Sequence, residues 1–409
     1  MKTRELTLYG LIGLVAVTTL AVNGCISHTV PQSQMHETTE WVIPCMFCKT
    51  GGFASFGKAG EWAMKEAIKD INAAGGIDGK PLRVEFYNSA SDPAQALTQV
   101  ARMIDTNPVM VMMLDGEPQT RAALPLCVQE KVYALSPCGS GQASLEYMPW
   151  NTYFMNNDQN GCSLHDIIWI QREPDIKRVV PICDSTVHFY HMCSRYRGQC
   201  LEEIGVEVLD EVTFEQFSTV DFDSVAVAAL AQNPDGFIFT SIGDPTAKTI
   251  KELYRRGVTE GRRISIHAWA DYPELFSIGS GYLEDVYLES FLNINHTGEK
   301  WQSIKTRYLE SVDNPNWLGM WTGYDMILFA KQAIEGSGIT GDPAKLAQER
   351  IMIRDWCYNQ KGVEFLMGEF DIVDGFRMHP LYLNQIDENN NRILIETIYA
   401  TETHPEGWQ

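Results

Sequence analysis

Positive charge is scarce in this chain of 409 residues. Lysine and arginine together number 32, against 53 aspartates and glutamates, which leaves a formal net charge of −21 at pH 7. Nucleic-acid binding depends on cationic side chains that neutralise phosphates, and a surface with this balance repels a phosphate backbone. The composition therefore excludes nucleic acid as an expected partner, but it does not choose among other ligands.

Long apolar segments are also missing, apart from one near the start. Residues 8–22 form a run of about 15 residues, which is typical of the hydrophobic part of a signal peptide and short for a membrane span. The run ends in AVNGC, which resembles a lipoprotein processing site with Cys25 as the lipidated residue. We therefore expect a lipoprotein signal peptide at 1–25 and a flexible polar tether at 26–40. The lipid anchor would hold the protein in the periplasm or at the outer face of the cytoplasmic membrane.

Signatures of common catalytic machinery are absent as well. The sequence contains no G-x-S-x-G motif, no phosphate-binding P-loop and no H-E-x-x-H motif. The segment GSGQAS at 139–144 imitates a dinucleotide-binding loop, but it ends in serine and no acidic residue follows at the expected distance. We therefore expect no catalytic residues, no cofactor and no enzymatic activity.

Short β-rich runs alternate with amphipathic helical runs from residue 41 onward. The predicted strands form two sets, at 41–44, 82–87, 109–114 and 132–136, and then at 178–183, 206–214, 236–241 and 264–270. Between the first two strands, residues 58–76 have helical apolar spacing and end in Gly75-Gly76, a C-terminal stop. This β-α-β alternation predicts α/β architecture, with two doubly wound parallel-sheet lobes.

Several motifs carry a family pattern across nearly everything after residue 40. They are GKAGEWAMKEAIKDINAAGGIDGKPLRVEFYNSASDPAQALTQVARMI (57–104), LSPCGSG (135–141), YFMNNDQNG (153–161), PDGFIFTSIGDP (234–245), GYDMILFAKQAIEGSG (323–338) and GEFDIVDGFRMHPLYLNQI (368–386). In these segments the chain resembles the type I periplasmic substrate-binding proteins of ABC transporters. The resemblance is to the branched-chain amino acid and amide-binding branch, which includes the leucine/isoleucine/valine-binding proteins.

The resemblance implies two lobes joined by a three-strand hinge that close over a small molecule. It divides the chain into lobe 1, at 41–157 and 293–358, and lobe 2, at 158–292 and 359–409. The loops that leave the carboxyl ends of parallel strands line the ligand cleft in such sheets. The segment CMFCKTGGFASFG at 45–57 follows the first strand, and we expect it to be one of these loops.

Matching positions in lobe 1 suggest ligand-binding residues. The family places an aromatic residue over the ligand after the first strand, where this chain has Phe56. A family loop of the form S-P-x-x-[ST] offers N–H groups and a hydroxyl to a ligand carboxylate at a helix start, where this chain has Cys138, Gly139 and Ser140. Phe56 has an alternative role as an apolar residue at the helix entry.

One lobe 1 loop departs from the family pattern. Where relatives carry a Ser/Thr pair for the carboxylate, this chain has Asp115, Gly116 and Glu117. Two carboxylates repel an anion and favour a cation or an amide, unless both point to solvent. A simple aliphatic amino acid is therefore not assured as the ligand.

Lobe 2 contributes further candidates by the same comparison. His188 and Tyr190 stand near the position of a family Tyr-Gly pair, and Asp244 lies on another cleft loop. Asp271 lies near the family carboxylate that pairs with a ligand ammonium. Trp269 could stack on the ligand or fill the core, and core is the usual role of a lone tryptophan in a strand.

The chain has ten cysteines, nine without Cys25, and their chemistry stays open at this stage. Exported cysteines often form disulfides, so Cys48 could pair with Cys45 or with Cys138, or the thiols could be inert. A redox role is disfavoured because several residues, KTGGFAS at 49–55, separate the C-x-x-C pair from the predicted helix. A soft-metal site is the remaining alternative, with the candidates Cys45, Cys48, His188, His191 and Cys193.

Together these features predict an extracytoplasmic lipoprotein that captures a small polar organic solute, an amino acid, amide or related molecule. Lobe closure would trap the solute, and the expected partner is an ABC transporter permease in the membrane. Two alternatives stay open: a sensory ligand-binding lipoprotein, and a metal-binding or redox lipoprotein that uses the cysteines of the cleft.

Overall fold

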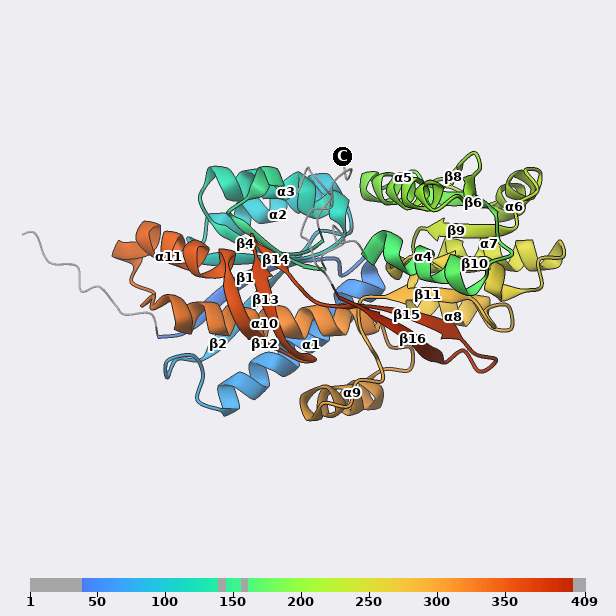
Figure 1. Ribbon diagram of the computed structural model, residues 1–409. Helices are drawn as coiled ribbons and strands as arrows, with labels where there is room; N and C mark the ends of the chain where they lie inside the picture. The colour runs from blue at the N-terminus through green and yellow to red at the C-terminus, as the bar shows by residue number, and fades with distance from the viewer. Residues whose placement is uncertain (1–38, 139–144, 156–160, 400–409) are drawn as a thin grey trace, which may run out of the picture. The chain divides into compact units, whose positions relative to one another are not determined.

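The structure is a computed structural model, which describes residues 39–138, 145–155 and 161–399. In these residues eleven α-helices and sixteen strands build two α/β lobes with one eight-stranded sheet each, and the predicted fold class is confirmed (Figure 1). None of the helices in this part of the chain is long and apolar enough to cross a membrane. The predicted signal peptide and Cys25 lie outside the described residues, as does all but the end of the predicted tether.

The sheet of lobe 1 has the order β12-β13-β14-β5-β4-β3-β1-β2. All neighbours from β14 to β2 pair in parallel, whereas β12, β13 and β14 pair antiparallel with one another. The strands are β1 Trp41–Phe47, β2 Leu82–Asn88, β3 Met110–Leu114, β4 Tyr133–Cys138, β5 Asn151–Met155, β12 Gln360–Phe365, β13 Gly368–Val373 and β14 Phe376–Arg377. The helices of this lobe are α1 Ala54–Ala73, α2 Pro93–Ile104, α3 Glu117–Gln129, α9 Glu299–Ser311, α10 Trp317–Ser337 and α11 Leu346–Tyr358.

Strand β3 shows why the central strands read as continuous apolar runs. Its side chains alternate between two cores: Val111 and Met113 join residues of α2 and α3, while Met110, Met112 and Leu114 join residues of α1 and α10. Because a strand turns successive side chains to opposite faces, a sheet covered on both faces needs apolar residues at every position.

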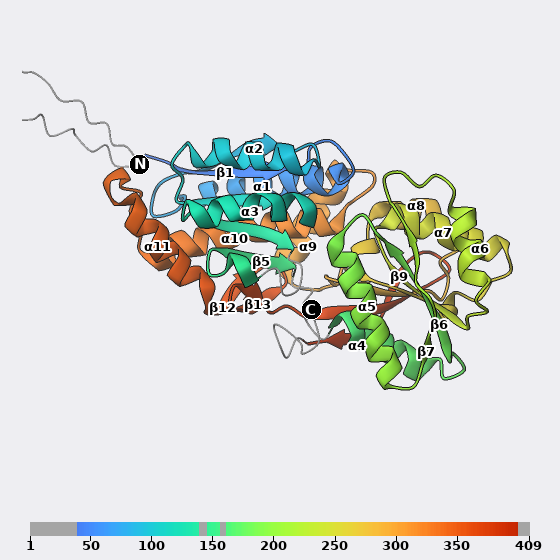
Figure 2. The same cartoon turned by 90° about the horizontal axis from the view of Figure 1, so that it is seen from above.

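The sheet of lobe 2 has the order β16-β15-β11-β10-β9-β6-β7, and β8 pairs with β6 beside this path. Its strands are β6 Arg178–Asp184, β7 Glu207–Val208, β8 Val212–Phe214, β9 Gly236–Thr240, β10 Ile264–Ile266, β11 Tyr287–Ser290, β15 Leu381–Ile386 and β16 Arg392–Ile398. Its helices are α4 Gly161–Arg172, α5 His188–Glu203, α6 Phe222–Leu230, α7 Gly243–Arg255 and α8 Pro273–Gly279. Helices α6, α7 and α8 share one core with β9, and α4 and α5 pack in the other (Figure 2).

The chain passes between the sheets three times, and one predicted boundary differs from these crossings. It leaves the first sheet after β5, returns after β11 and crosses again between β14 and β15. The predicted lobe 2 segment at 359–409 therefore includes three strands, β12, β13 and β14, that belong to the lobe 1 sheet. These short antiparallel strands have no helix between them, so the β-α-β pattern gave no sign of the sheet they would join.

The family motifs have local structural roles. In the D-P-x-Q-A motif, Asp92 caps α2 by accepting a hydrogen bond from the N–H of Gln95 at 2.7 Å. In the D-I-N-A-A-G-G motif, the Asn72 amide donates to the carbonyl of Leu82 at 2.9 Å and accepts from its N–H at 2.8 Å. These bonds fix the end of α1 to the start of β2, and Gly75 and Gly76 turn the chain with φ of 106° and 80°.

Candidate functional site

A cavity lies where loops of both sheets meet. It is lined by Phe53, Phe56, Asp115, Gly116, Glu117, Pro118 and Cys138 of lobe 1, and by Val187, Phe189, Tyr190, Trp269 and Tyr272 of lobe 2. These residues follow or end β1, β3, β4, β6 and β10, at the carboxyl ends of parallel strands. The empty space here, including some open solvent, is about 370 Å³, and only about 20 Å³ can hold the centre of a water molecule. The side chains themselves therefore fill most of this space, which stays partly open to solvent.

Half of the residues that line the cavity are aromatic. Phe56 of α1 stacks on Tyr272, which precedes α8, with ring centroids 6.5 Å apart and an interplanar angle of 25°. Phe189 lies 6.4 Å from Trp269 in an edge contact. The Phe56–Tyr272 pair joins the two lobes, so a solute that enters must share or displace this stacking contact.

Asp115 forms part of the lobe 1 wall and is 1% exposed. Its carboxylate accepts hydrogen bonds from the hydroxyl of Ser89 and from the N–H of Gly116, the latter at 2.7 Å. Burial nevertheless dominates and raises the pKa of Asp115 from 3.8 to about 6, although the bonds from Ser89, Gly116 and Cys48 oppose this shift. The charge of this carboxyl group is therefore sensitive to pH between about 5 and 7 and to what occupies the cavity.

Glu117 is the second acidic residue of the wall. It is the first residue of α3 and is 7% exposed, with the guanidinium of Arg121 3.7 Å from its Oε1. An acidic residue in the first turn is favourable because the N–H groups of the turn carry partial positive charge. No basic residue of the described chain lines the cavity itself. The lobe 1 wall is therefore electronegative.

Trp269 gives the lobe 2 wall a polar group of the opposite character. It lies in the 3-10 turn Ala268–Ala270, is 6% exposed, and its indole Nε1 has no hydrogen-bond partner among the described residues. A buried N–H group without an acceptor costs about 1–3 kcal/mol. A ligand atom that accepts this hydrogen bond would recover the cost, so Trp269 is a candidate ligand contact as well as a core residue.

The structure gathers five of the predicted site residues at the cavity: Phe56, Gly116, Glu117, Cys138 and Tyr190. Their contact with a ligand stays a prediction. Gly139 and Ser140 lie outside the described residues. The sequence comparison did not select Phe53, Pro118, Val187, Phe189 and Tyr272, and for Trp269 it preferred a core role over stacking on the ligand. Of these, Val187 and Phe189 could have been found, because they flank His188 on the same turn.

Three predicted site residues of lobe 2 lie outside the cavity lining. His188 is exposed at the first position of α5, while its neighbours Phe189 and Tyr190 face the cavity. Asp244 is half-buried with a side chain 39% exposed, and its carboxylate lies 2.6 Å from the ammonium of Lys248 of the same helix. Both side chains therefore belong to the solvated surface.

Asp271 differs most from its predicted role. Its carboxylate is 4% exposed and forms a buried ion pair with the guanidinium of Arg392 on β16. It also accepts a hydrogen bond from the hydroxyl of Ser290 at 2.7 Å. Because this charge is already balanced inside lobe 2, Asp271 joins β16 to the core and is not placed to pair with a ligand ammonium.

Eight cysteines, those whose side chains the structure describes, are thiols without disulfide bonds. The predicted loop at 45–57 begins later than expected, because Cys45 lies inside β1 and its sulfur is 3.8 Å from that of Met64. The sulfur of Cys48 lies 3.1 Å from the carbonyl of Phe53. Burial raises the pKa of both thiols well above its usual range, which disfavours the reactive thiolate. The C-x-x-C pair is therefore a packing feature in this structure.

Comparison with known proteins agrees with this architecture. Residues 40–391 match the family model described as periplasmic binding protein. An amino acid binding protein of Pseudomonas aeruginosa PAO1 is 23% identical over 254 residues, which cover 60% of this chain. The alignment spans 64% of that relative, less than two thirds of its length.

Solved structures share the fold at low sequence identity. The leucine binding protein LivK of Thermotoga maritima MSB8 has a TM-score of 0.73 and 19% identity, over 88% of this chain and 99% of that one. LivJ of Streptococcus pneumoniae, in complex with isoleucine, has a TM-score of 0.73 and 16% identity, over 87% and 99%. A solute binding protein of an ABC transporter from Rhodopseudomonas palustris BisB5, in complex with 3,4-dihydroxy benzoic acid, reaches 0.76 and 17%, over 90% and 99%. The resemblance to periplasmic binding proteins noted in the sequence is confirmed, and the chain belongs to the periplasmic binding protein family.

Proposed function

We propose that this protein is a lipid-anchored binding protein that captures a small polar organic solute outside the cytoplasmic membrane and delivers it to an ABC transporter permease. Its family consists of substrate-binding proteins of the periplasm. The observation that carries the proposal is the cavity at the carboxyl ends of both sheets. Two acidic residues line one wall, and Trp269, whose indole N–H has no hydrogen-bond partner among the described residues, lines the other. Lobe closure over the solute would require no covalent chemistry.

The two walls define the solute by its hydrogen-bonding groups. Asp115 and Glu117 favour an ammonium or an amide N–H, whereas the indole N–H of Trp269 favours an acceptor such as a carbonyl or carboxylate oxygen. The aromatic rings around them favour a flat or apolar body and, through their faces, a cation. An amino acid, an amino acid amide or a related amine with a carbonyl meets all three conditions.

Structures of similar proteins hold small organic molecules of the proposed kind. The solved structures named above hold isoleucine in one case and 3,4-dihydroxy benzoic acid in another, so the fold accommodates both aliphatic and aromatic molecules. The pair of acids in this chain argues against a ligand whose only polar group is a carboxylate at that wall, because like charges repel in a buried site. We therefore place an amine or amide group of the solute beside Asp115.

The first experiment is native mass spectrometry of the protein purified without added ligand. An organic mass that leaves on denaturation identifies the solute, and calorimetric titration with amino acids and their amides then measures its affinity. If neither method detects binding of an organic molecule, the proposal is wrong.

Trp269→Phe tests the contribution of the lobe 2 wall. The variant keeps the ring but removes the N–H group, so we expect affinity for the solute to fall roughly two- to tenfold, the loss of one neutral hydrogen bond. Trp301→Phe is the matched control, because Trp301 is buried in α9 and donates to the carbonyl of Ile294 at 3.2 Å, outside the cavity lining. Equal affinities in both variants would remove the indole N–H from the site.

A further inference from the structure

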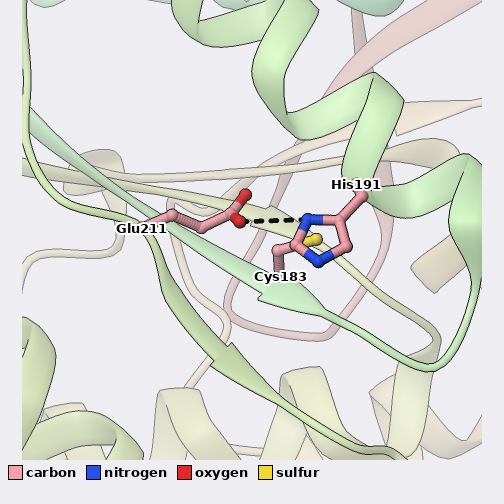
Figure 3. A group of neighbouring side chains, drawn as sticks. All are labelled: Cys183, His191 and Glu211. Carbon is pink, nitrogen blue, oxygen red and sulfur yellow. Dashed lines mark ion pairs between the residues drawn. The ribbon is translucent and has the colours of Figure 1, made fainter.

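Three side chains with metal-binding chemistry meet on lobe 2, and none of them lines the solute cavity. They are Cys183 of β6, His191 of α5 and Glu211 of the segment between β7 and β8, and Figure 3 shows them turned toward one another. One ligand atom from each residue lies within 4.8 Å of the other two. Within the described part of the chain, no second group of three such residues comes together in this way.

The fold brings these residues together from three separate elements. Strand β8 pairs in parallel with β6 and sets Cys183 opposite Thr213, so Glu211 enters just before the paired segment. Helix α5 begins at His188, shortly after β6 ends, and its first turn carries His191 back toward the same strand. The ligand atoms are therefore fixed by a central strand, a helix and the start of a paired strand, and rigid elements of this kind hold a site more closely than loops do.

The carboxylate of Glu211 is already oriented for this role. Its Oε1 accepts a hydrogen bond from the hydroxyl of Ser194 at 2.5 Å, and its Oε2 lies 3.1 Å from Nδ1 of His191. A cation between the imidazole and Oε2 would replace their direct contact and leave the bond from Ser194 in place. Metal-binding carboxylates are commonly held by an outer hydrogen bond of this type.

Burial gives the group a closed side and an open side. The side chain of Cys183 is fully buried, whereas those of His191 and Glu211 are 39% and 24% exposed. A cation can therefore enter from solvent and keep water as a further ligand. Three protein ligands with an open position are a known arrangement for zinc.

The ligand types select the class of cation. Thiolate and imidazole favour zinc and similar borderline-soft ions, whereas magnesium and calcium prefer sites made of oxygen atoms. Two ligands on a tetrahedral zinc lie roughly 3.3–3.6 Å apart, given metal–ligand distances of about 2.0–2.3 Å. The observed limit of 4.8 Å requires side-chain adjustments of only about 1 Å to reach that geometry.

We propose that Cys183, His191 and Glu211 bind a borderline-soft divalent cation such as zinc on lobe 2, separately from the solute. The site would fasten the first turn of α5 to β6. That turn follows Val187 and carries Phe189 and Tyr190, which line the solute cavity. The proposal does not depend on which solute the cavity takes.

Zinc binding to the reduced, chelator-treated protein tests the proposal. Native mass spectrometry and competition with a colorimetric zinc chelator should give one zinc ion per chain for the wild type. Glu211→Gln and His191→Ala change partly exposed side chains, so both variants should fold, and each should weaken zinc binding at least tenfold. His188→Ala is the matched control, because His188 is an exposed histidine on the same helix and should leave zinc binding unchanged.

Cobalt reports the remaining ligand directly. Cobalt bound to the wild type should give a thiolate-to-cobalt charge-transfer band in the near ultraviolet, and Cys183→Ser should lose it while Cys127→Ser, a buried thiol of lobe 1, keeps it. Absence of stoichiometric zinc in the wild type would overturn the proposal. So would undiminished zinc binding by His191→Ala and Glu211→Gln, or bound cobalt without a thiolate band. None of these results bears on solute binding, which the organic mass in native spectra decides independently.

Discussion

Acidification should weaken solute binding through Asp115. The proposed solute presents an ammonium or amide N–H to this carboxyl group, and only the ionised form accepts such a group fully. Burial raises the pKa of Asp115 to about 6 in the ligand-free protein. The carboxyl group is then about 90% ionised at pH 7 and about 10% ionised at pH 5. We therefore expect the Kd of the solute to rise roughly tenfold between these two pH values and to change little above pH 7.

The raised pKa of Asp115 also affects stability: acidification should stabilise the folded protein while it weakens solute binding. The folded protein holds this proton more tightly than the unfolded chain does, because the folded pKa lies above the unfolded value of 3.8. The stability that Asp115 contributes is therefore complete below about pH 4 and is lost as the pH rises through about 6. Two pKa units correspond to roughly 3 kcal/mol. Asp115→Asn should thus raise the free energy of unfolding of the ligand-free protein at pH 7 by about 1–3 kcal/mol.

Calorimetric titration of the solute at pH 5, 6, 7 and 8 measures the first effect, and urea unfolding at pH 4 and pH 7 measures the second. Asp115→Asn should bind more weakly than the wild type at pH 7 and lose most of the pH dependence, while Glu130→Gln, an exposed acid of the same lobe, should behave like the wild type. Affinity that increases on acidification would refute the reasoning, since it would mean that a solute carboxylate meets a protonated Asp115. A destabilised Asp115→Asn protein at pH 7 would refute the stability argument.

Two further predictions concern packing outside the cavity. Asp271→Ala should lower the free energy of unfolding by about 3 kcal/mol, because it leaves Arg392 buried without its partner, while solute affinity stays unchanged. Urea unfolding compares Asp271→Ala with Asp244→Asn, which removes a partly exposed ion pair and should lower the free energy of unfolding by less than about 1 kcal/mol. Weaker solute binding by Asp271→Ala at normal stability would contradict the structural role of Asp271. Gly323→Ala should destabilise lobe 1 by about 1–3 kcal/mol, because the added methyl group would lie 2.5 Å from the carbonyl oxygen of Gly60, where α10 crosses α1. Thermal unfolding should show little change for Glu335→Ala on the exposed face of the same helix, and an equally stable Gly323→Ala protein would show that the helices can separate freely.

The sequence was sufficient for the central architecture of both lobes. The central parallel strands are mostly apolar, and the helices between them have their own period, so β1, β2, β3, β4, β6 and β9 could be located to within a few residues. The segment predicted as one strand at 206–214 is divided into β7 and β8, and the predicted strand at 264–270 ends early in a 3-10 turn. The antiparallel strands β12 to β16 were harder to assign, because the alternation of side chains along a strand does not indicate which sheet the strand joins.

The candidate site was predictable in part because strand ends are predictable. Gly116, Glu117 and Cys138 follow or end β3 and β4, so the sequence alone located them at the cleft. The lobe 2 residues depend instead on the rotation of a short turn, which sequence spacing does not determine to one residue. On α5 the sequence comparison selected His188, which is exposed, whereas the neighbouring Phe189 is buried and lines the cavity.

Asp271 shows why the identity of a residue cannot settle its role. A carboxylate near the ligand position of relatives has two ways to balance its charge, a ligand ammonium or a cation of the chain itself. In this protein the cation is Arg392, which lies 121 positions later on β16. Strand β16 pairs antiparallel with β15, and no local sequence pattern predicts this pairing. With that charge satisfied internally, lobe 2 offers the solute an indole N–H and aromatic rings, and the acidic groups stand on lobe 1. Recognition of an amine or amide is therefore expected to depend on Asp115 and Glu117, on the opposite wall from the carboxylate that the family comparison selected.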